Sequence, residues 1–385
     1  MKINFAFLFW LLPVWGFAQQ VKITHGPYLQ ALGENEVTIV WTTDNPAVSW
    51  VELAPAGDDS FYAQERPQYC QTRHGNRVVG QLHQVTIQGL ERGTEYRYRI
   101  FSQAVFDQSG TLSCGRVASS NVYSKKPLRF TTSDSQKTDL SFVALNDIHG
   151  RQDDLRALCG NVKYGKTDLV IFNGDMVDRM DGEQQFFDAF MDEAVKLFAG
   201  EVPVFYARGN HETRGTFHPY FADYFPSRNG QLYYSFRHGP VHFIVLDSGE
   251  DKPDSDVEYF GLARFDAYRS QQQEWLKKEI ESESFRSASY RMVIVHIPPT
   301  GSDWHGAAEV KNKFLPLLRH AGITVMFCGH THKYQYIAPD DQLHDFPILI
   351  NAPNTALEVS ATPNALSVKR KDTAGKELNV FTYKH

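Results

Sequence analysis

Five apolar runs in this chain each end next to side chains that can bind metal ions. The runs are followed by Asp147-Ile148-His149, Gly174-Asp175, Gly209-Asn210-His211-Glu212, His296, and Gly329-His330-Thr331-His332. Carboxylate and imidazole groups suit zinc, manganese or iron rather than a metal that prefers thiolates. The sequence therefore predicts a metal site whose ligands come from several distant segments.

The apolar runs themselves predict the elements that position these ligands. Each run has about five residues rich in Val, Ile and Phe, and longer amphipathic stretches separate the runs, as in buried strands joined by helices. In open α/β sheets the binding crevice lies beyond the carboxyl ends of the strands. We expect seven side chains to meet there: Asp147, His149, Asp175, Asn210, His296, His330 and His332.

The order and placement of the five motifs carry more information than any one of them. Alone, each motif is common, and an Asp at the end of a strand is more often a turn former than a ligand. Together they resemble the calcineurin-like metallophosphoesterase superfamily. The resemblance covers residues 139 to about 338, with all five motifs intact, and implies an αββα layered domain.

The resemblance also implies two metal ions bridged by Asp175. One ion would be held by Asp147, His149, Asp175 and His332, and the other by Asp175, Asn210, His296 and His330. Two dications, zinc, manganese or iron, acidify a bridging water and clamp the attacking and leaving oxygens at phosphorus. The implied reaction is hydrolysis of a phosphate ester by a metal-bridging hydroxide.

Three further residues are assigned catalytic roles by the resemblance. His211 directly follows the ligand Asn210 and would donate a proton to the leaving oxygen, a role suited to an imidazole. Asp178 and Arg179 match residues that orient the catalytic His and bind phosphate in serine/threonine phosphoprotein phosphatases. The alternative for these two is an Asp at a helix N-terminus and a surface Arg.

Two departures separate this chain from purple acid phosphatases, whose N-terminal sandwich it shares in outline. Those enzymes carry Gly-Asp-x-x-Tyr, and here the Tyr position is Asp178. They also carry Asp-x-Gly where this chain has His149. We therefore expect no tyrosinate-to-iron colour. The motif at residues 329–332 departs in turn from the phosphoprotein phosphatases.

The first part of the chain predicts an all-β sandwich. Residues 21–132 contain period-two alternation, including the expected strands 36–43 and 47–52, and no convincing helix. Gly93-Thr94-Glu95-Tyr96 before a strand is similar to the tyrosine corner of fibronectin type III domains. The polar segment 133–138 is the expected linker. We predict a fibronectin type III-like domain at 19–133 and a metallophosphoesterase domain at 139–385.

The second part alternates strands with amphipathic segments. Helices are expected near 153–164, 183–198, 270–282 and 307–320, a hairpin at 233–246, and a final pair of strands at 366–371 and 377–383.

Three features of the second part could bear on the site. The long polar and aromatic segment 248–266 could form a substrate lid. Trp275 is expected in the core. His305 could touch substrate, although a solvated loop His is the more common case.

Length and composition favour a two-domain globular protein. At 385 residues, with 42% hydrophobic residues, the chain is long for a single core. The basic Lys2 and the apolar stretch from Ile3 to Ala18 predict a signal peptide at 1–18, hence a secreted or periplasmic protein. No further membrane span is expected. A disulfide between Cys70 and Cys114 is left open.

The net charge of −6 and the lack of a basic stripe argue against general nucleic-acid binding. The expected partner is a small phosphate ester. Together these features predict that the protein is a secreted dinuclear-metal phosphomonoesterase. The alternatives are a phosphodiesterase using the same site, and a binding protein with a relic metallophosphoesterase domain. The sequence does not indicate an oligomeric state.

Overall fold

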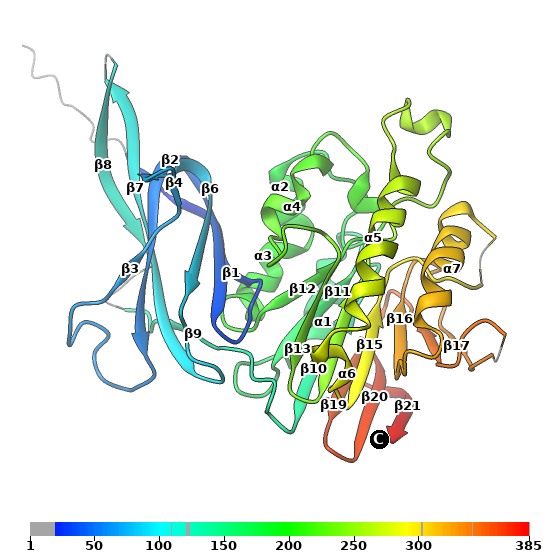
Figure 1. Cartoon of the computed structure of the whole chain (residues 1–385). Coiled ribbons are helices and arrows are strands. Elements are labelled where there is room, and N and C mark those ends of the chain that lie inside the picture. The colour runs from blue at the N-terminus through cyan, green and yellow to red at the C-terminus, as the bar shows by residue number, and fades with distance from the viewer. Residues whose placement is uncertain (1–19, 109, 121–123, 302, 341, 385) are drawn as a thin grey trace, which may run out of the picture.

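The computed structural model describes residues 20–384, apart from 109, 121–123, 302 and 341. It shows a β-rich N-terminal region beside a layered α/β region (Figure 1). The predicted signal peptide at 1–18 lies outside the described residues. The N-terminal strands are β1 (Ile23–Gln30), β2 (Glu36–Pro55), β3 (Gln68–Tyr69), β4 (Thr72–Arg73), β5 (Asn76–Arg77), β6 (Val79–Gln88), β7 (Glu95–Gln108), β8 (Thr111–Ser119) and β9 (Leu128–Thr131).

The long strand β2 belongs to both layers of the N-terminal sandwich. Its first half pairs with β1 and β6, and its second half pairs with β7 and β3. The register shifts between Thr42 and Ala47, where Pro46 has no N–H for the ladder. The sequence predicts two separate strands here, and the structure joins them. Trp41 Nε1 donates to Ser102 Oγ (2.9 Å) in the buried core.

The tyrosine corner is present. The Tyr96 hydroxyl accepts a hydrogen bond from the backbone N–H of Glu91 at 2.9 Å, so the ring binds back to upstream backbone as predicted. Cys70 and Cys114 do not form a disulfide in the structure, because both thiols are free. Cys70 follows β3 at one edge of the sheet and Cys114 lies on β8 at the other, with β2 and β7 between them. Three strand spacings exceed the reach of a disulfide.

Two six-stranded sheets form the centre of the α/β region. The first has the order β12-β11-β10-β19-β20-β21, and the second β13-β14-β15-β16-β18-β17. The first sheet consists of β10 (Leu140–Leu145), β11 (Leu169–Asn173), β12 (Val204–Ala207), β19 (Thr355–Ala361), β20 (Ala365–Asp372) and β21 (Glu377–Lys384). The second consists of β13 (Tyr234–His238), β14 (Val241–Val245), β15 (Tyr290–Ile294), β16 (Val325–Cys328), β17 (Gln335–Ile337) and β18 (Ile348–Ile350).

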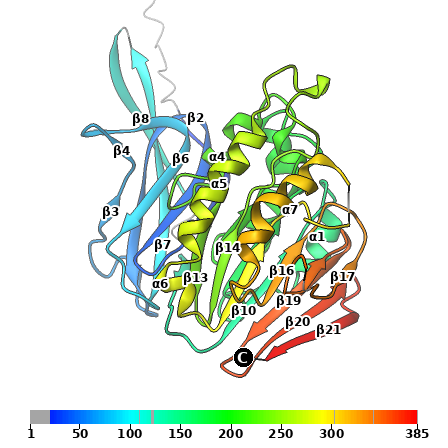
Figure 2. The same ribbon diagram turned by 45° about the vertical axis from the view of Figure 1, so that its right-hand side comes forward.

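Helices cover the outer face of each sheet, which gives the predicted αββα order (Figure 2). The first sheet is covered by α1 (Gln152–Cys159), α2 (Glu183–Phe186), η1 (Phe187–Met191), α3 (Asp192–Ala194), η2 (Val195–Ala199) and α4 (Phe221–Tyr224). The second is covered by α5 (Phe265–Glu279), α6 (Glu283–Arg286) and α7 (His305–Leu318). Short 3₁₀ turns are η3 (His211–Thr213), η4 (His218–Tyr220) and η5 (Val257–Tyr259). All four predicted helices and the predicted hairpin are present.

The period-two pattern of the buried strands explains the layers. In β10, Phe142 and Ala144 join the core between the two sheets, whereas Val143 and Leu145 join the core beneath the helices. Both faces of the strand are therefore buried, as its continuous apolar sequence predicts. Parallel pairing of β10, β11 and β12, and of β14, β15 and β16, brings their carboxyl ends to one margin.

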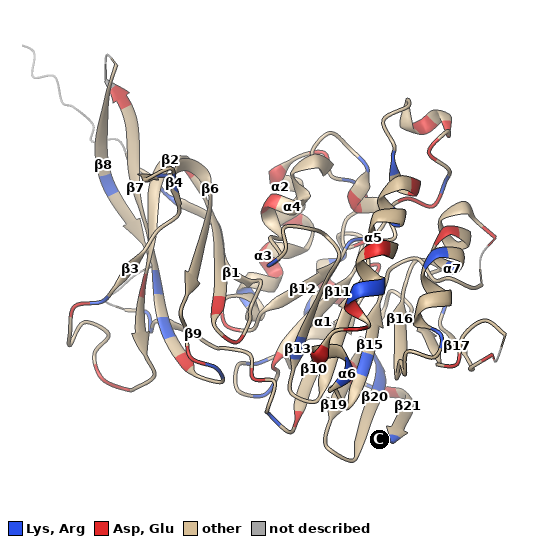
Figure 3. Cartoon of the chain, in the orientation of Figure 1, with Lys and Arg blue, Asp and Glu red and all other residues tan. Residues whose placement is uncertain are grey.

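The N-terminal region packs against the helices outside the first sheet. The buried hydroxyls of Tyr28 and Tyr98 donate to the backbone carbonyls of Tyr224 (2.9 Å) and Gly200 (2.6 Å). Lys and Arg are interspersed with Asp and Glu over both regions (Figure 3). Within the described residues, no helix has the length and apolar character needed to cross a membrane.

Candidate metal centre

All seven predicted ligands lie just beyond strand ends at this one margin. Asp147 and Asp175 follow the parallel neighbours β10 and β11, and Asn210 follows β12. His296 and the His330–His332 pair follow β15 and β16 in the other sheet. Each of the two sheets thus positions some of the seven predicted metal ligands.

The backbone at the ligands is strained. Five of them have a positive φ, which is uncommon for residues other than Gly: Asp147 (54°), His149 (48°), Asp175 (53°), His330 (70°) and His332 (56°). Each such residue costs about 1 kcal/mol or more and persists only where the surrounding structure enforces it. Strain concentrated on these residues is typical of a functional site.

Three glycines allow the ligand loops to approach one another. A Cβ on Gly209 would lie 2.2 Å from Asp175 Oδ1, and one on Gly329 would lie 2.7 Å from Asp147 Oδ2. A Cβ on Gly174 would lie 2.5 Å from the ring of His296. Close packing therefore requires the glycine that precedes each of three predicted ligands, Asp175, Asn210 and His330.

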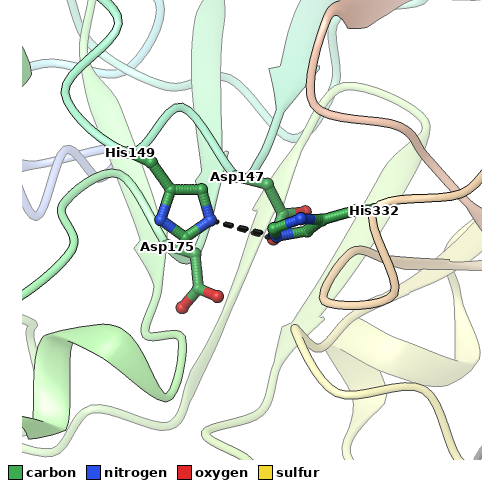
Figure 4. A group of neighbouring side chains, drawn as sticks. All are labelled: Asp147, His149, Asp175 and His332. Atoms are coloured by element: carbon green, nitrogen blue, oxygen red, sulfur yellow. Dashed lines mark hydrogen bonds and ion pairs between the residues drawn. The ribbon is translucent and has the colours of Figure 1, made fainter.

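Four of the ligands form one compact group, shown in Figure 4. Asp147, His149, Asp175 and His332 each offer an atom within 4.8 Å of the others. His332 Nε2 lies 3.3 Å from Asp147 Oδ1 and 3.1 Å from His149 Nε2.

A second group shares Asp175 with the first. His296 Nε2 lies 3.0 Å from Asp175 Oδ2, and His330 completes the group of three. Asn210 joins it through Oδ1, which lies 3.0 Å from His330 Nδ1. Two overlapping groups with one common carboxylate are the arrangement that a pair of bridged metal ions requires.

Buried atoms without hydrogen-bond partners show that the residues fit metal ions. Asp147 Oδ1 and His296 Nε2 are buried, and among the described residues neither makes a contact with hydrogen-bond geometry, although each lies within 4 Å of an oppositely charged group. Unpaired polar atoms in a protein interior are costly, and a bound cation would satisfy both. The other imidazole nitrogen of His296 donates to the Asn173 carbonyl at 2.7 Å, which directs Nε2 towards Asp175.

The electrostatics of the two Asp residues also favour cations. Burial raises the pKa of Asp147 and of Asp175, but the surrounding imidazoles outweigh burial and leave both pKa values below the usual range. Burial lowers the pKa of His296, and the charge of Asp175 more than compensates and raises it to about 10. Burial, with His296 nearby, lowers the pKa of His330 to about 4. The carboxylates are thus ionised, as metal ligands must be.

Glu212 ends the motif Gly209-Asn210-His211-Glu212, and the sequence indicates no role for it, whereas the structure does. Its fully buried carboxylate accepts from the backbone N–H groups of Asp175 (2.9 Å), Met176 (2.7 Å) and Gly209 (2.9 Å). It also accepts from the Tyr206 hydroxyl at 2.7 Å. Glu212 therefore ties two ligand loops together.

His211 lies beside the metal groups with one nitrogen facing the cleft. Its Nδ1 donates to the backbone carbonyl of Asp178 at 2.7 Å, so Nε2 is the atom left for substrate. Nε2 lies 3.9 Å from Asp175 Oδ2 and 3.3 Å from Arg214 Nη1. The Asp178 side chain instead contacts His149 Nδ1 at 2.9 Å.

An open cleft of about 520 Å³ leads to the ligands. Its described lining includes Arg214, Asp251, Lys252 and Trp304 in addition to ligands and His211. Arg179, predicted to bind phosphate, pairs with Asp181 at 3.2 Å and is not part of that lining. Nothing in the sequence distinguishes Arg214 from other surface Arg residues.

The remaining predicted features lie around the cleft or away from it. The segment 248–266 contributes Asp251 and Lys252 to the lining. His305 Nε2 binds Asp266 Oδ1 at 2.8 Å. The prediction of Trp275 in the core needs a correction, because Trp275 is only partly buried and packs at the edge of a core cluster.

The model of the calcineurin-like phosphoesterase family matches residues 140–334, and that of the purple acid phosphatase N-terminal domain matches residues 24–126. The chain is 25% identical over 327 residues to purple acid phosphatase 18 of Arabidopsis thaliana, covering 80% of this chain and 65% of that protein. It is 24% identical over 346 residues to purple acid phosphatase 21 of the same plant, covering 84% and 67%.

A mammalian relative shows similar identity. The chain is 25% identical over 334 residues to acid phosphatase type 7 of Mus musculus, covering 81% of this chain and 70% of that protein. The chain thus spans 65% to 70% of the length of these three relatives.

Proposed function

Because the chain belongs to the calcineurin-like phosphoesterase family, we propose that it is a metal-dependent phosphoesterase acting mainly on phosphomonoesters. The observation that carries the proposal is the meeting of seven ligand side chains in two groups around Asp175. These side chains come from loops after five strands of two sheets.

The two groups would each hold one metal ion. Asp147, His149, Asp175 and His332 would bind the first, and Asp175, Asn210, His296 and His330 the second. When bound, the ions supply Lewis acidity for the phosphoryl oxygens and for the attacking water. Zinc, manganese and iron all suit this donor set.

The residues of the chain supply positioning and proton transfer. In the hydrolysis the water loses a proton to solvent, its oxygen forms the new bond to phosphorus, and the ester P–O bond breaks. The leaving oxygen takes a proton from His211 Nε2, and solvent returns a proton to His211. The Asp178 carbonyl holds the His211 ring in the orientation that presents this nitrogen, and Arg214 lies where it can contact a phosphoryl oxygen.

Preference for monoesters is supported by the charge of the cleft wall. A monoester carries two negative charges near neutral pH. The cations Arg214 and Lys252 both line the cleft, together with the carboxyl of Asp251, and each of them is paired with a neighbouring carboxylate. A diester has one charge and needs space for a second substituent. The open rim does not exclude it, so a diesterase activity is the alternative.

The test compares nitrophenyl phosphate with bis-nitrophenyl phosphate, with Mn²⁺ or Zn²⁺ supplied. We expect higher kcat/KM for the monoester. Faster cleavage of the diester would reverse the preference, and turnover of neither substrate would refute the phosphoesterase assignment. Metal analysis after chelation and reconstitution separates an enzyme from a relic, since the relic would bind fewer than about one ion per chain.

We also propose that the protein is secreted or periplasmic. The support is the signal-like sequence at 1–18. Fractionation of cells expressing the full chain tests this, and retention in the cytoplasm would contradict it.

A further inference from the structure

The cleft that leads to the predicted ligands is lined by charged and aromatic side chains. The lining includes Arg214, Asp251 and Lys252, and also Gly301, Trp304 and Thr331. A substrate whose phosphate reaches the predicted ligands must place the rest of the molecule among these residues.

Trp304 is a large aromatic side chain exposed to solvent at this site. It is 55% exposed, and its ring centroid lies 5.8 Å from that of the ligand His330, at an interplanar angle of 78°. An exposed Trp face next to a polar site is a surface on which a planar ring can stack.

The backbone of Trp304 is fixed by the start of α7. Its carbonyl accepts from Ala308 N–H at 3.0 Å in the first turn. The next residue, His305, binds Asp266 at 2.8 Å. Trp304 is therefore attached to a rigid element rather than to a free loop.

Backbone contacts join the charged residues of the cleft to the start of α7, next to Trp304. Gly306 N–H donates to the Asp251 carbonyl at 2.9 Å, and a Cβ on Gly306 would lie 2.7 Å from the Glu250 carbonyl. Glu250 in turn binds Arg214 Nε at 2.6 Å. The buried Arg269 also donates a hydrogen bond to the Glu250 carbonyl. The position of Arg214 relative to the start of α7 is thus set by the fold.

We propose that the cleft selects phosphomonoesters that carry a planar heteroaromatic ring, as a nucleoside monophosphate does, with the ring stacked on Trp304. Arg214, beside His211, faces the phosphate end of the same substrate. This inference rests on the proposed phosphomonoesterase function, because it places the phosphate at the ligands.

The experiment compares AMP with ribose 5-phosphate on metal-loaded protein. The two share a primary alcohol leaving group and differ in the base, so the ratio of their kcat/KM values isolates recognition of the ring. We expect the wild-type protein to favour AMP, and Trp304→Ala to lower the ratio about ten-fold, in line with one base–aromatic stack. Trp304→Phe should keep most of the ratio.

Tyr220→Ala is the matched control, because Tyr220 is 54% exposed and lies outside the described cleft lining. It should leave the ratio at the wild-type value. Arg214→Gln should raise KM for both substrates by a similar factor, because both carry the same phosphate. A Trp304→Ala ratio equal to that of the wild type would overturn the inference, including the case in which both activities fall together.

Calorimetric binding of the same two compounds separates this inference from the proposed function. Tighter binding of AMP that depends on Trp304, without turnover of either compound, would refute the phosphomonoesterase function and keep the aromatic subsite. Turnover of both compounds with equal affinity and equal kcat/KM would keep the phosphomonoesterase function and refute the aromatic subsite.

Discussion

The fixed orientation of His211 leads to the first prediction at the scale of single residues. Its Nδ1 is committed to the Asp178 carbonyl, so only Nε2 can exchange a proton with a substrate in the cleft. His211→Ala should lose a factor of about 10²–10⁴ in kcat, the usual contribution of general acid catalysis. Metal content should stay at the wild-type level, since neither metal group requires this ring. Full activity of the variant would remove His211 from the mechanism.

Asp175 should behave differently, because it belongs to both groups of ligands. Asp175→Asn keeps the shape of the side chain but removes the charge that two cations would share. We expect metal binding and activity to be lost together, as measured by metal analysis and turnover on the same samples. A variant that kept two ions per chain would show that Asp175 does not bridge them.

The sequence predicts the positions of side chains that directly follow strands. It does not predict the roles of residues that depend on contacts with distant parts of the chain. Each of the seven proposed ligands comes just after an apolar run, so the sequence places it at the sheet margin. Glu212 acts by accepting from the backbone of residues 37 and 36 positions away, and no local pattern reveals that. The sequence favours Arg179 through its motif and gives no signal at Arg214, and only the fold places Arg214 in the cleft.

At the scale of elements, the ligand loops depend on the Glu212 carboxylate. Three backbone N–H groups and the Tyr206 hydroxyl donate to its two oxygens. Glu212→Gln replaces one acceptor oxygen by an N–H₂ group that faces donors in a fully buried site. The free energy of unfolding should fall by about 2–4 kcal/mol, because buried donors lose their partner.

Denaturant unfolding of the metal-loaded protein measures this effect. Glu274→Gln on α5 is the control, since Glu274 is 66% exposed and should change stability by less than about 0.5 kcal/mol. Equal stability of the two variants would mean that the loops hold their geometry without Glu212.

The element boundaries show where sequence patterns stop being informative. The predicted helix at 270–282 begins earlier, at Phe265, because the Asp254 carboxylate accepts from the N–H groups of Phe265 (2.8 Å) and Asp266 (3.2 Å). This carboxylate comes from eleven residues upstream and so does not look like a helix cap in sequence. The joining of 36–43 and 47–52 into β2 similarly depends on the partner strands on each side.

At the scale of the whole molecule, the N-terminal region contacts the outer helices of the first sheet rather than the ligand margin. Tyr28, Tyr98 and His25 all point into this junction. None of the described cleft-lining residues belongs to the N-terminal strands. The region therefore packs on the α/β region through this junction, which can contribute to stability.

The junction should make stability depend on pH. His25 stacks on Phe187 with ring centroids 4.0 Å apart, and its Nδ1 lies 2.9 Å from Asp192 Oδ1. Burial lowers the pKa of His25, but the bond and charge of Asp192 outweigh burial and raise it above 6.5. A raised pKa in the folded state adds stability that is complete below the unfolded pKa and is lost as pH rises through the folded pKa.

His25→Phe keeps an aromatic ring for the stack and removes the titrating group. It should lower the free energy of unfolding by about 0.5–1 kcal/mol at pH 5.5, a small value because Asp192 is 40% exposed. At pH 8.5 the difference from wild type should shrink, because this stabilisation is lost as pH rises through the folded-state pKa of His25. Asp192→Asn should show the same pH pattern, and chemical denaturation of all three proteins at both pH values measures it. A difference that grew from pH 5.5 to pH 8.5 would mean that the imidazolium does not stabilise the junction.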